Sequence, residues 1–307
     1  MPEWKPPTQA EVENYFERLN NWGRWGSDDQ RGTLNLITPE KRAAAVSSAR
    51  RGRVVSLSRD LTPQPTLDYH MLHPVRRGRS QAAVDYVGLV YHGVTVTHMD
   101  ALCHVEYQGK LYNGRSFADN VGFGGAKWGA LDIWFDGVVT RGVLLDVASG
   151  RSEGYVRIGQ PVTPPELDAA AARAGVAVEP GDFVVIRSGR EAYEKAGAIA
   201  AASVPTRDIA NLDARPGLHI ACLEWLRERD VSGIAWDMLD ERPVGYGMDF
   251  GVHLGIPLLG LCLIDNVYPE RVVTACAEEQ RYEFLFVAMP LRIAGSTGSP
   301  CQPVAIF

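Results

Sequence analysis

Strand-like and helix-like segments alternate through the second half of the chain, and this order limits the fold more than any other feature. The helix-like segments carry their own boundary signals, such as the capping box Thr163-Pro-Pro-Glu166 at a helix start and Gly175 at its end. Two parallel strands need a crossover connection, usually a helix. The strand, helix, strand order occurs twice, over residues 142–146, 163–175, 183–187, 218–229 and 233–237. The sequence therefore predicts an α/β fold.

The remaining segments fit a single domain preceded by an arm. We expect a short helix over 10–20, a loop over 21–26, and a helix that Thr38-Pro39 opens and Gly52 ends. Further strands are predicted at 54–58, 82–97, 261–264 and 282–289, with a helix at 269–279. Because no repeat or linker interrupts this series, residues 1–52 are assigned to an N-terminal arm and helix, and residues 53–307 to one domain.

Charge and composition exclude several classes of partner. The 307 residues carry a net charge of −6, and the richest basic stretch, with Arg76, Arg77 and Arg79, is short enough to be a solvated loop, so no nucleic acid is expected. There is no secretory signal and no apolar run of membrane-spanning length. Five cysteines at irregular spacings favour reduced thiols. We predict a cytoplasmic protein that acts on a small molecule and has no membrane partner.

Histidines gather in one short segment. Of the seven in the chain, His92, His98 and His104 fall within thirteen residues, together with Asp100 and Glu106. In an extended segment His98 and Asp100 share one face, about 7 Å apart. A bend at residues 101–103 would return His104 to the same point. Imidazole and carboxylate ligands suit Zn²⁺ or Mn²⁺, so the segment is a candidate metal site.

Other interpretations of this segment remain open. His98 and Asp100 could be a hydrogen-bonded pair on a half-buried strand, with His104 on the surface. Six extended residues span about 20 Å, which places His92 outside the ligands of any ion at His98. Cys103 is expected to be a core thiol, and the glycine-rich residues 122–127 to be a loop, because they lack the Lys-Ser/Thr ending of a phosphate loop.

The histidine segment resembles a known family. Residues 97–104, Thr-His-Met-Asp-Ala-Leu-Cys-His, match the motif T-H-x-D-x-x-x-H of the bacterial cyclase family, which includes kynurenine formamidases and isatin hydrolase. Residues 25–35, 110–114, 141–146 and 182–189 add weaker similarity. The resemblance implies a swivelling β/β/α domain that assembles as a homodimer or homotetramer. It also implies that His98 and Asp100 are ligands of a divalent Zn²⁺ or Mn²⁺ ion, and that His104 is the acid/base residue.

A second element of the family has a histidine near the metal and a glutamate twelve residues later. His253 and Asp265 have this spacing, with Asp in place of Glu, and are assigned as further metal ligands by resemblance. At Val94 this chain lacks the first histidine of the family motif. Either one ion is held by fewer ligands, or a bulge lets His92-Gly93 replace the missing residue. The extended-chain distance favours the first alternative.

The resemblance and the residue chemistry together imply a metal-dependent hydrolase. A divalent ion lowers the pKa of bound water and polarises a carbonyl group, while a histidine moves the protons. The bond cleaved would be the C–N or C–O bond of an amide, lactam, lactone or formyl group in a small, aromatic or cyclic substrate. The alternatives are a metal-dependent isomerase or dehydratase of a carbonyl compound, and a non-catalytic member that has lost its metal.

Overall fold

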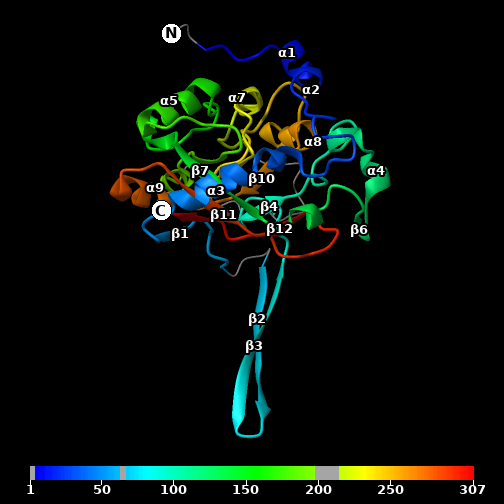
Figure 1. Cartoon of the computed structure of the whole chain (residues 1–307), viewed down its shortest axis with the longest axis vertical. Coiled ribbons are helices and arrows are strands. Elements are labelled where there is room, and N and C mark those ends of the chain that lie inside the picture. Colours follow the sequence, from blue (N-terminus) through cyan, green and yellow to red (C-terminus); the bar gives the residue numbers. More distant parts are fainter. Residues whose placement is uncertain (1–3, 63–66, 198–213) are drawn as a thin grey trace.

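A computed structural model describes residues 4–62, 67–197 and 214–307 (Figure 1). Within these ranges the chain forms a main sheet of nine strands in the order β1-β13-β11-β7-β8-β9-β10-β4-β12. Their bounds are β1 Val54–Ser56, β4 His98–Asp100, β7 Val138–Asp146, β8 Phe183–Arg187, β9 Gly233–Trp236, β10 Cys262–Asp265, β11 Glu283–Ala288, β12 Gly298–Pro300 and β13 Val304–Ile306.

The centre of the sheet is parallel, as is usual where strands alternate with helices. Strands β7, β8, β9 and β10 pair in parallel, and the strands outside them pair antiparallel. Helix α5 (Pro164–Ala174) connects β7 to β8, α7 (Cys222–Glu228) precedes β9, and α9 (Glu270–Glu279) connects β10 to β11. The predicted α/β single-domain fold is confirmed.

Local signals fix several helix ends. The side chain of Thr38 accepts a hydrogen bond from the Lys41 amide at 3.1 Å, and so caps α3 (Pro39–Ser48). The Glu166 carboxylate accepts from the amide and the hydroxyl of Thr163 at the start of α5. Gly175 ends α5 at φ 65°, in the left-handed region. Helix α3 then packs against β7 and β11.

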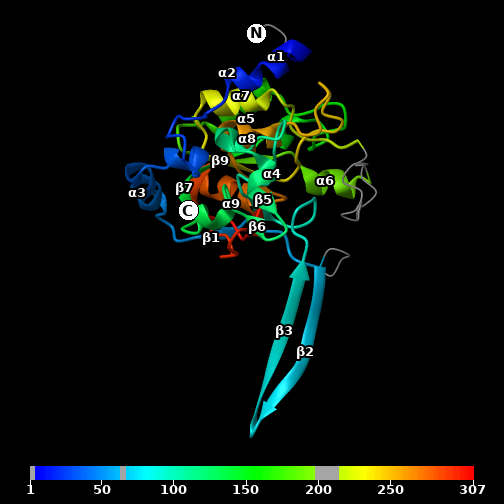
Figure 2. The same cartoon turned by 90° about the vertical axis from the view of Figure 1, so that its right-hand side faces the viewer.

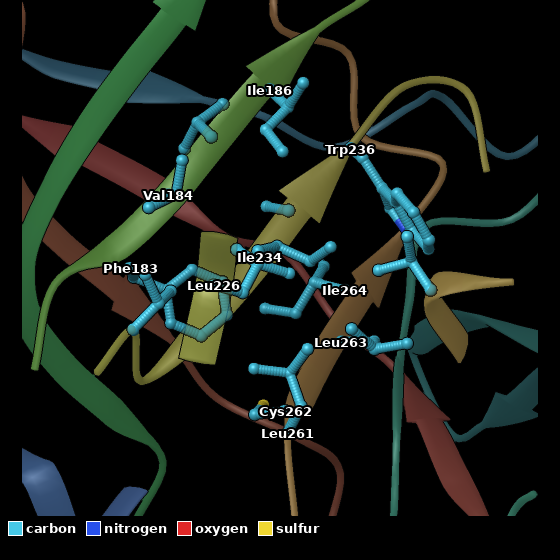
Figure 3. Close-up of a cluster of buried hydrophobic side chains, with 14 of the residues drawn as sticks. Phe183, Val184, Ile186, Leu226, Ile234, Trp236, Leu261, Cys262, Leu263 and Ile264 are labelled. Carbon is cyan, nitrogen blue, oxygen red and sulfur yellow. The ribbon is translucent and has the colours of Figure 1, made fainter. Parts of the chain in front are cut away.

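The core lies along the parallel strands. Their side chains are apolar on both faces, as expected for strands covered on both sides. Phe183 of β8 stacks on Phe286 of β11 with ring centroids 4.4 Å apart. Figure 3 shows β8, β9 and β10 packing with Leu226 of α7. This core holds the ends of β9 and β10, where the polar residues gather.

One predicted strand takes a different course. Residues 82–97 were expected to run extended into the histidines, but β3 ends at Leu89 and pairs only with β2 (Leu67–Arg77). The two strands form a hairpin that projects from the body, and the loop predicted at 73–79 is instead its outer end (Figures 1 and 2). The β-branched residues identify a strand but not its partner. Residues 90–97 then bend, with Gly93 at φ 125°.

The other elements are short. The helix expected at 10–20 is divided into α1 (Gln9–Glu13) and α2 (Tyr15–Arg18), and residues 122–127 belong to a small hairpin of β5 (Val121–Gly122) and β6 (Gly125–Ala126) instead of a loop. The remaining α-helices of the described ranges are α4 (Phe117–Asn120), α6 (Arg190–Lys195) and α8 (Gly255–Leu259). No helix in the described part of the chain is both long and apolar enough to cross a membrane.

Candidate metal centre

Strands β4 and β10 bring the first three polar residues together. They pair antiparallel, with His98 opposite Asp265 and Asp100 opposite Leu263. His98 and Asp100 share a strand face, as predicted, and His98 Nε2 lies 3.4 Å from Asp100 Oδ1. The same nitrogen lies 3.9 Å from Asp265 Oδ2. All three residues are buried in the described structure.

His253 joins them from the short turn Val252–Leu254 before α8. Its Nε2 atom lies 3.1 Å from Asp265 Oδ2 and 3.8 Å from Asp100 Oδ2. Its other ring nitrogen, Nδ1, lies 2.6 Å from the carboxylate of Asp240, which fixes the ring orientation. Trp236 of β9 donates an indole hydrogen bond to Asp265. The twelve-residue spacing of His253 and Asp265 therefore does place them in one cluster with Asp100.

The distance expected between His92 and the rest of the site is wrong. Its Nδ1 atom lies 3.1 Å from Asp100 Oδ1, and its ring stacks on His104 with centroids 3.8 Å apart and planes 4° apart. The distance argument assumed an extended chain between His92 and His98, whereas this segment folds back on itself. His104 Nε2 lies 3.8 Å from Asp100 Oδ1. Together with His253, four imidazoles therefore lie within 4 Å of the carboxylate of Asp100.

An asparagine and an arginine hold the folded segment in place. Asn266 Nδ2 donates to the carbonyls of Gly93 (2.7 Å) and Val96 (3.0 Å). Arg190 donates to Asn266 Oδ1 at 3.0 Å and to the Val94 carbonyl at 2.7 Å. We refer to these four hydrogen bonds as the 93–96 bracket. Sequence reasoning missed both side chains, because no motif links residues so far apart in the chain.

A buried aspartate fixes the position of Arg190, one of the two donors of the 93–96 bracket. Asp237 directly follows β9, and its carboxylate accepts hydrogen bonds from the amides of Ser188, Gly189 and Arg190 at 2.7 to 3.0 Å. These amides lie at the start of α6, where a helix has unpaired N–H groups. The carboxylate that the sequence places at the end of this strand thus positions Arg190.

The donor atoms fit a divalent ion. Neither oxygen of Asp100 nor Nδ1 of His92 has a hydrogen-bond partner within the described ranges, although all three atoms are buried. Such groups are costly unless something neutralises them. His98 Nδ1 donates to the Val96 carbonyl at 2.8 Å, which leaves Nε2 with a free lone pair. Two sets of ligand atoms are close enough for one ion each, His92, His98 and Asp100, and Asp100, His253 and Asp265.

The ionisable side chains of the cluster shift the pKa values of one another. Burial alone would raise the pKa of Asp100, but the imidazoles of His104 and His98 hold this pKa well below its usual range. Burial would lower the pKa of His98, and Asp100 outweighs that effect and raises it. Burial likewise opposes protonation of His253, yet Asp240 and Asp265 raise its pKa well above the ordinary value. A site that attracts protons in this way also attracts a cation in their place.

His104 differs from its neighbours. Burial lowers its pKa to about 4, so the imidazole is neutral at neutral pH. Its neighbour Cys103 is fully buried, and burial raises the pKa of this thiol to about 12, in agreement with the predicted core thiol. Glu106 points elsewhere, since it accepts from the Gly109 amide.

A cluster of histidines and aspartates at the ends of the parallel strands of a mixed sheet defines the class, an α/β protein with a candidate metal centre. The profile of the family described as putative cyclase matches residues 54–241, more than half of the chain. The chain therefore belongs to the putative cyclase family. The matched range includes His92, His98, Asp100 and His104, and stops before His253 and Asp265.

Solved structures share this fold. A novel cyclase is 28% identical over 95% of this chain and 99% of its own, with a TM-score of 0.81. Isatin hydrolase A from Ralstonia solanacearum is 20% identical over 87% and 97%, with a TM-score of 0.55. Isatin hydrolase A from Labrenzia aggregata bound to benzyl benzoate is 18% identical over 86% and 99%, with a TM-score of 0.50. No curated protein matches the sequence.

Proposed function

We propose that this protein is a metal-dependent hydrolase that cleaves the C–N or C–O bond of an amide, lactam, lactone or formyl group in a small substrate. The observation that carries the proposal is the buried Asp100 carboxylate, which has four imidazoles within 4 Å and makes no hydrogen bond to a described residue. The isatin hydrolase names of two structural relatives support a cyclic substrate.

His92, His98 and Asp100 are proposed to hold a Zn²⁺ or Mn²⁺ ion, with His253 and Asp265 forming the adjoining set of ligand atoms. When bound, the ion supplies a Lewis acid that activates water and polarises a carbonyl oxygen. Asp240 orients His253, and the Val96 carbonyl orients His98. The protein thus holds its donor atoms in place before the ion binds.

His104 is proposed to move the protons. As a neutral imidazole it accepts a proton when water attacks the carbonyl carbon, and as an imidazolium it returns that proton to the leaving nitrogen or oxygen. The stacked ring of His92 fixes the plane of His104. The side chains of His92 and His104 are each 24% exposed, whereas that of His98 is 1% exposed, so these two rings face the side from which a substrate arrives.

A substrate panel tests the proposal. Chelator-treated protein, alone and reloaded with Zn²⁺ or Mn²⁺, is incubated with isatin and with small formamides, lactams, lactones and esters, and products are followed by mass spectrometry. We expect an ion-dependent product that has gained one water, and its loss in His104→Ala. The matched control is Glu106→Gln, which lies two residues away, is exposed and retains activity.

Three results would contradict the proposal. A product of unchanged mass would indicate an isomerase, and the loss of one water would indicate a dehydratase. Ion binding without turnover of any member of the panel would favour a non-catalytic protein.

A further inference from the structure

Two arginines lie side by side next to the candidate metal centre, and the proposed function does not use them. Arg215 and Arg242 form an antiparallel bridge, with hydrogen bonds of 3.1 and 2.9 Å between their backbone amides and carbonyls. Residues paired in this way direct their side chains to the same face. Arg215 Nε also donates to the carbonyl of Asp240 at 3.0 Å, and the carboxylate of Asp240 orients His253.

The two guanidinium groups have no carboxylate partner among residues 4–62, 67–197 and 214–307. The side chain of Arg215 makes its one hydrogen bond in these ranges to a backbone carbonyl, and Nε of Arg242 is buried without any partner there. Like charges directly opposite one another destabilise a strand pair, and a buried donor without an acceptor is costly. An anion bound at this pair would relieve both costs.

Burial strengthens the effect of these charges. Burial, with a smaller contribution from the charge of Arg242, lowers the pKa of Arg215 to about 10, against the opposing charges of Asp240 and Asp265. The guanidinium group therefore remains charged at neutral pH although it is removed from water. An ion pair formed here would be screened less than one on the surface.

A phenylalanine connects the arginines with the metal ligands. The Phe250 ring centroid lies 5.7 Å from the Arg242 guanidinium carbon and 5.8 Å from the centroid of the His253 ring. The Phe250 side chain is only partly buried, so a planar group can rest on its ring. The neighbouring carboxyl of Glu241 lies near His219 instead, with Oε1 3.8 Å from Nε2.

The charges around an ion-loaded centre favour an anionic ligand. Asp100, Asp240 and Asp265 carry three negative charges, whereas a divalent ion and the two arginines carry four positive charges. The excess of one positive charge attracts a monoanion. Among monoanions, a carboxylate matches the planar, forked donors of arginine.

We propose that Arg242 and Arg215 bind a carboxylate group of the substrate, and that the substrate is therefore an anion whose ring rests on Phe250. This inference rests on the proposed function, which places the scissile bond at the ion. Because the bound carboxylate lies at Arg242 and not at the ion, it is a group that the substrate brings and not one that hydrolysis creates.

Benzoate and benzamide test this, because they are an anion and a neutral molecule of nearly the same shape. Isothermal titration calorimetry on Zn²⁺-loaded protein measures both affinities without turnover. The wild type should bind benzoate more tightly than benzamide, and added salt should weaken only benzoate. Arg242→Gln should weaken benzoate about 10–100-fold, the usual loss of charged hydrogen bonds, and leave benzamide unchanged. Arg242→Lys keeps the charge but not the planar fork and should lose less.

Arg292→Gln is the matched control, because the Arg292 guanidinium carbon also lies over an aromatic ring, 4.5 Å from the centroid of Phe135. It should bind both molecules as the wild type does. The titrations are repeated on chelator-treated protein. A chain that binds no ion contradicts the proposed metal-dependent function, while the ratio of the benzoate affinities of the wild type and Arg242→Gln still tests Arg242.

Three results would overturn the inference. The wild type could show no preference for benzoate over benzamide. Arg242→Gln could retain the wild-type affinity for benzoate, which would mean that the ion alone holds the anion. Arg292→Gln could lose as much affinity for benzoate as Arg242→Gln, which would mean that the loss reflects overall charge and not a site at Arg242.

Discussion

Asp100 is the residue on which the candidate centre depends. Its carboxylate is buried between His92, His98 and His104, and it belongs to both sets of possible ligand atoms. Removing an imidazole leaves the buried Asp100 carboxylate with fewer partners. What is lost depends on which imidazole is removed. The histidines can therefore be separated by what each substitution removes.

His92→Ala should weaken ion binding although His92 was not expected to reach the site. Loss of an outer-sphere partner typically costs about 10–100-fold in metal affinity, and loss of a direct ligand should cost more. Competition with a metal-sensitive dye measures this affinity, and circular dichroism confirms the fold. If His92→Ala binds the ion as tightly as the wild type, His92 is not a ligand.

His104→Ala should behave in the opposite way. We expect the ion to remain and turnover to fall about 10²–10⁴-fold, the usual contribution of general acid–base catalysis. Steady-state kinetics measures the turnover, and elemental analysis of the same sample measures the bound ion. A variant that has lost its metal and recovers activity with excess ion would show His104 to be a ligand instead.

Glu241 provides a test of the electrostatics outside the centre. Burial, with a smaller contribution from the charge of Asp240, raises the pKa of this carboxyl to about 7. Between pH 4.5 and 7 the unfolded chain ionises first, so the folded state loses stability as pH rises. Between pH 5 and pH 8, the free energy of unfolding of Glu241→Gln should therefore rise by roughly 1–3 kcal/mol relative to that of the wild type.

Thermal or denaturant unfolding at the two pH values measures this gain. The exposed Glu228→Gln is the control and should show no pH-dependent difference. An equal gain for both variants would mean that burial of Glu241 is not the cause.

Among single residues, the sequence predicts those contacts that depend on local backbone geometry. The alternation of side chains along a strand is sufficient to place His98 beside Asp100. His253 and Asp265 were assigned by family spacing, and they also meet Asp100. His92 could not be placed, because its position depends on hydrogen bonds to residues more than 90 positions away.

Among the elements, the 93–96 bracket makes the sharpest prediction. Asn266 has φ 55°, in the left-handed region, so Asn266→Gly removes the amide without backbone strain. The carbonyls of Gly93 and Val96 lose a donor, and His92 and His98 lose their fixed separation. We expect ion affinity to fall about 10–100-fold, with recovery at high ion concentration.

Asn113 is a matched control for Asn266. It has φ 56°, donates two hydrogen bonds to the carbonyls of Gly26 and Asp29, and accepts one from the Gly23 amide. Asn113→Gly should lower stability and leave ion affinity unchanged. Equal losses of affinity in both variants would mean that Asn266 has only a structural role.

Predictions for the elements succeeded where the signal is short-range. The caps of α3 and α5 and the runs of β7, β8 and β9 are visible in the sequence because each depends on residues within a few positions. The course of residues 67–97 was not predictable in the same way. Whether β3 continues into β4 or folds back on β2 is decided by tertiary contacts and not by strand propensity.

For the whole molecule, the alternating pattern predicts the parallel centre of the sheet but not its antiparallel borders. Strands β12 and β13 contain three residues each and join the sheet from the end of the chain. Their pairing with β4 and with β1 and β11 is not local. Strand β4, which carries His98 and Asp100, pairs with β10 on one side and with β12 on the other. These pairings place the two residues at the ends of the parallel strands.

The number of ions is a property of the assembled centre. The sequence predicts one ion per chain because Val94 replaces a family histidine. His92 removes that reason, since it stands beside Asp100. We still expect one tightly held ion, at His92, His98 and Asp100, because His253 Nε2 and Asp265 Oδ2 of the other set already lie 3.1 Å apart, at hydrogen-bond distance.

The central claim is that this buried cluster is a divalent metal centre. Equilibrium dialysis of chelator-treated protein against Zn²⁺ or Mn²⁺, followed by elemental analysis, tests it most directly. We predict about one ion per wild-type chain, and almost none in His98→Ala and Asp100→Ala variants whose circular dichroism spectra are unchanged. A wild-type chain that retains no ion, or variants that retain as much as the wild type, would contradict the account.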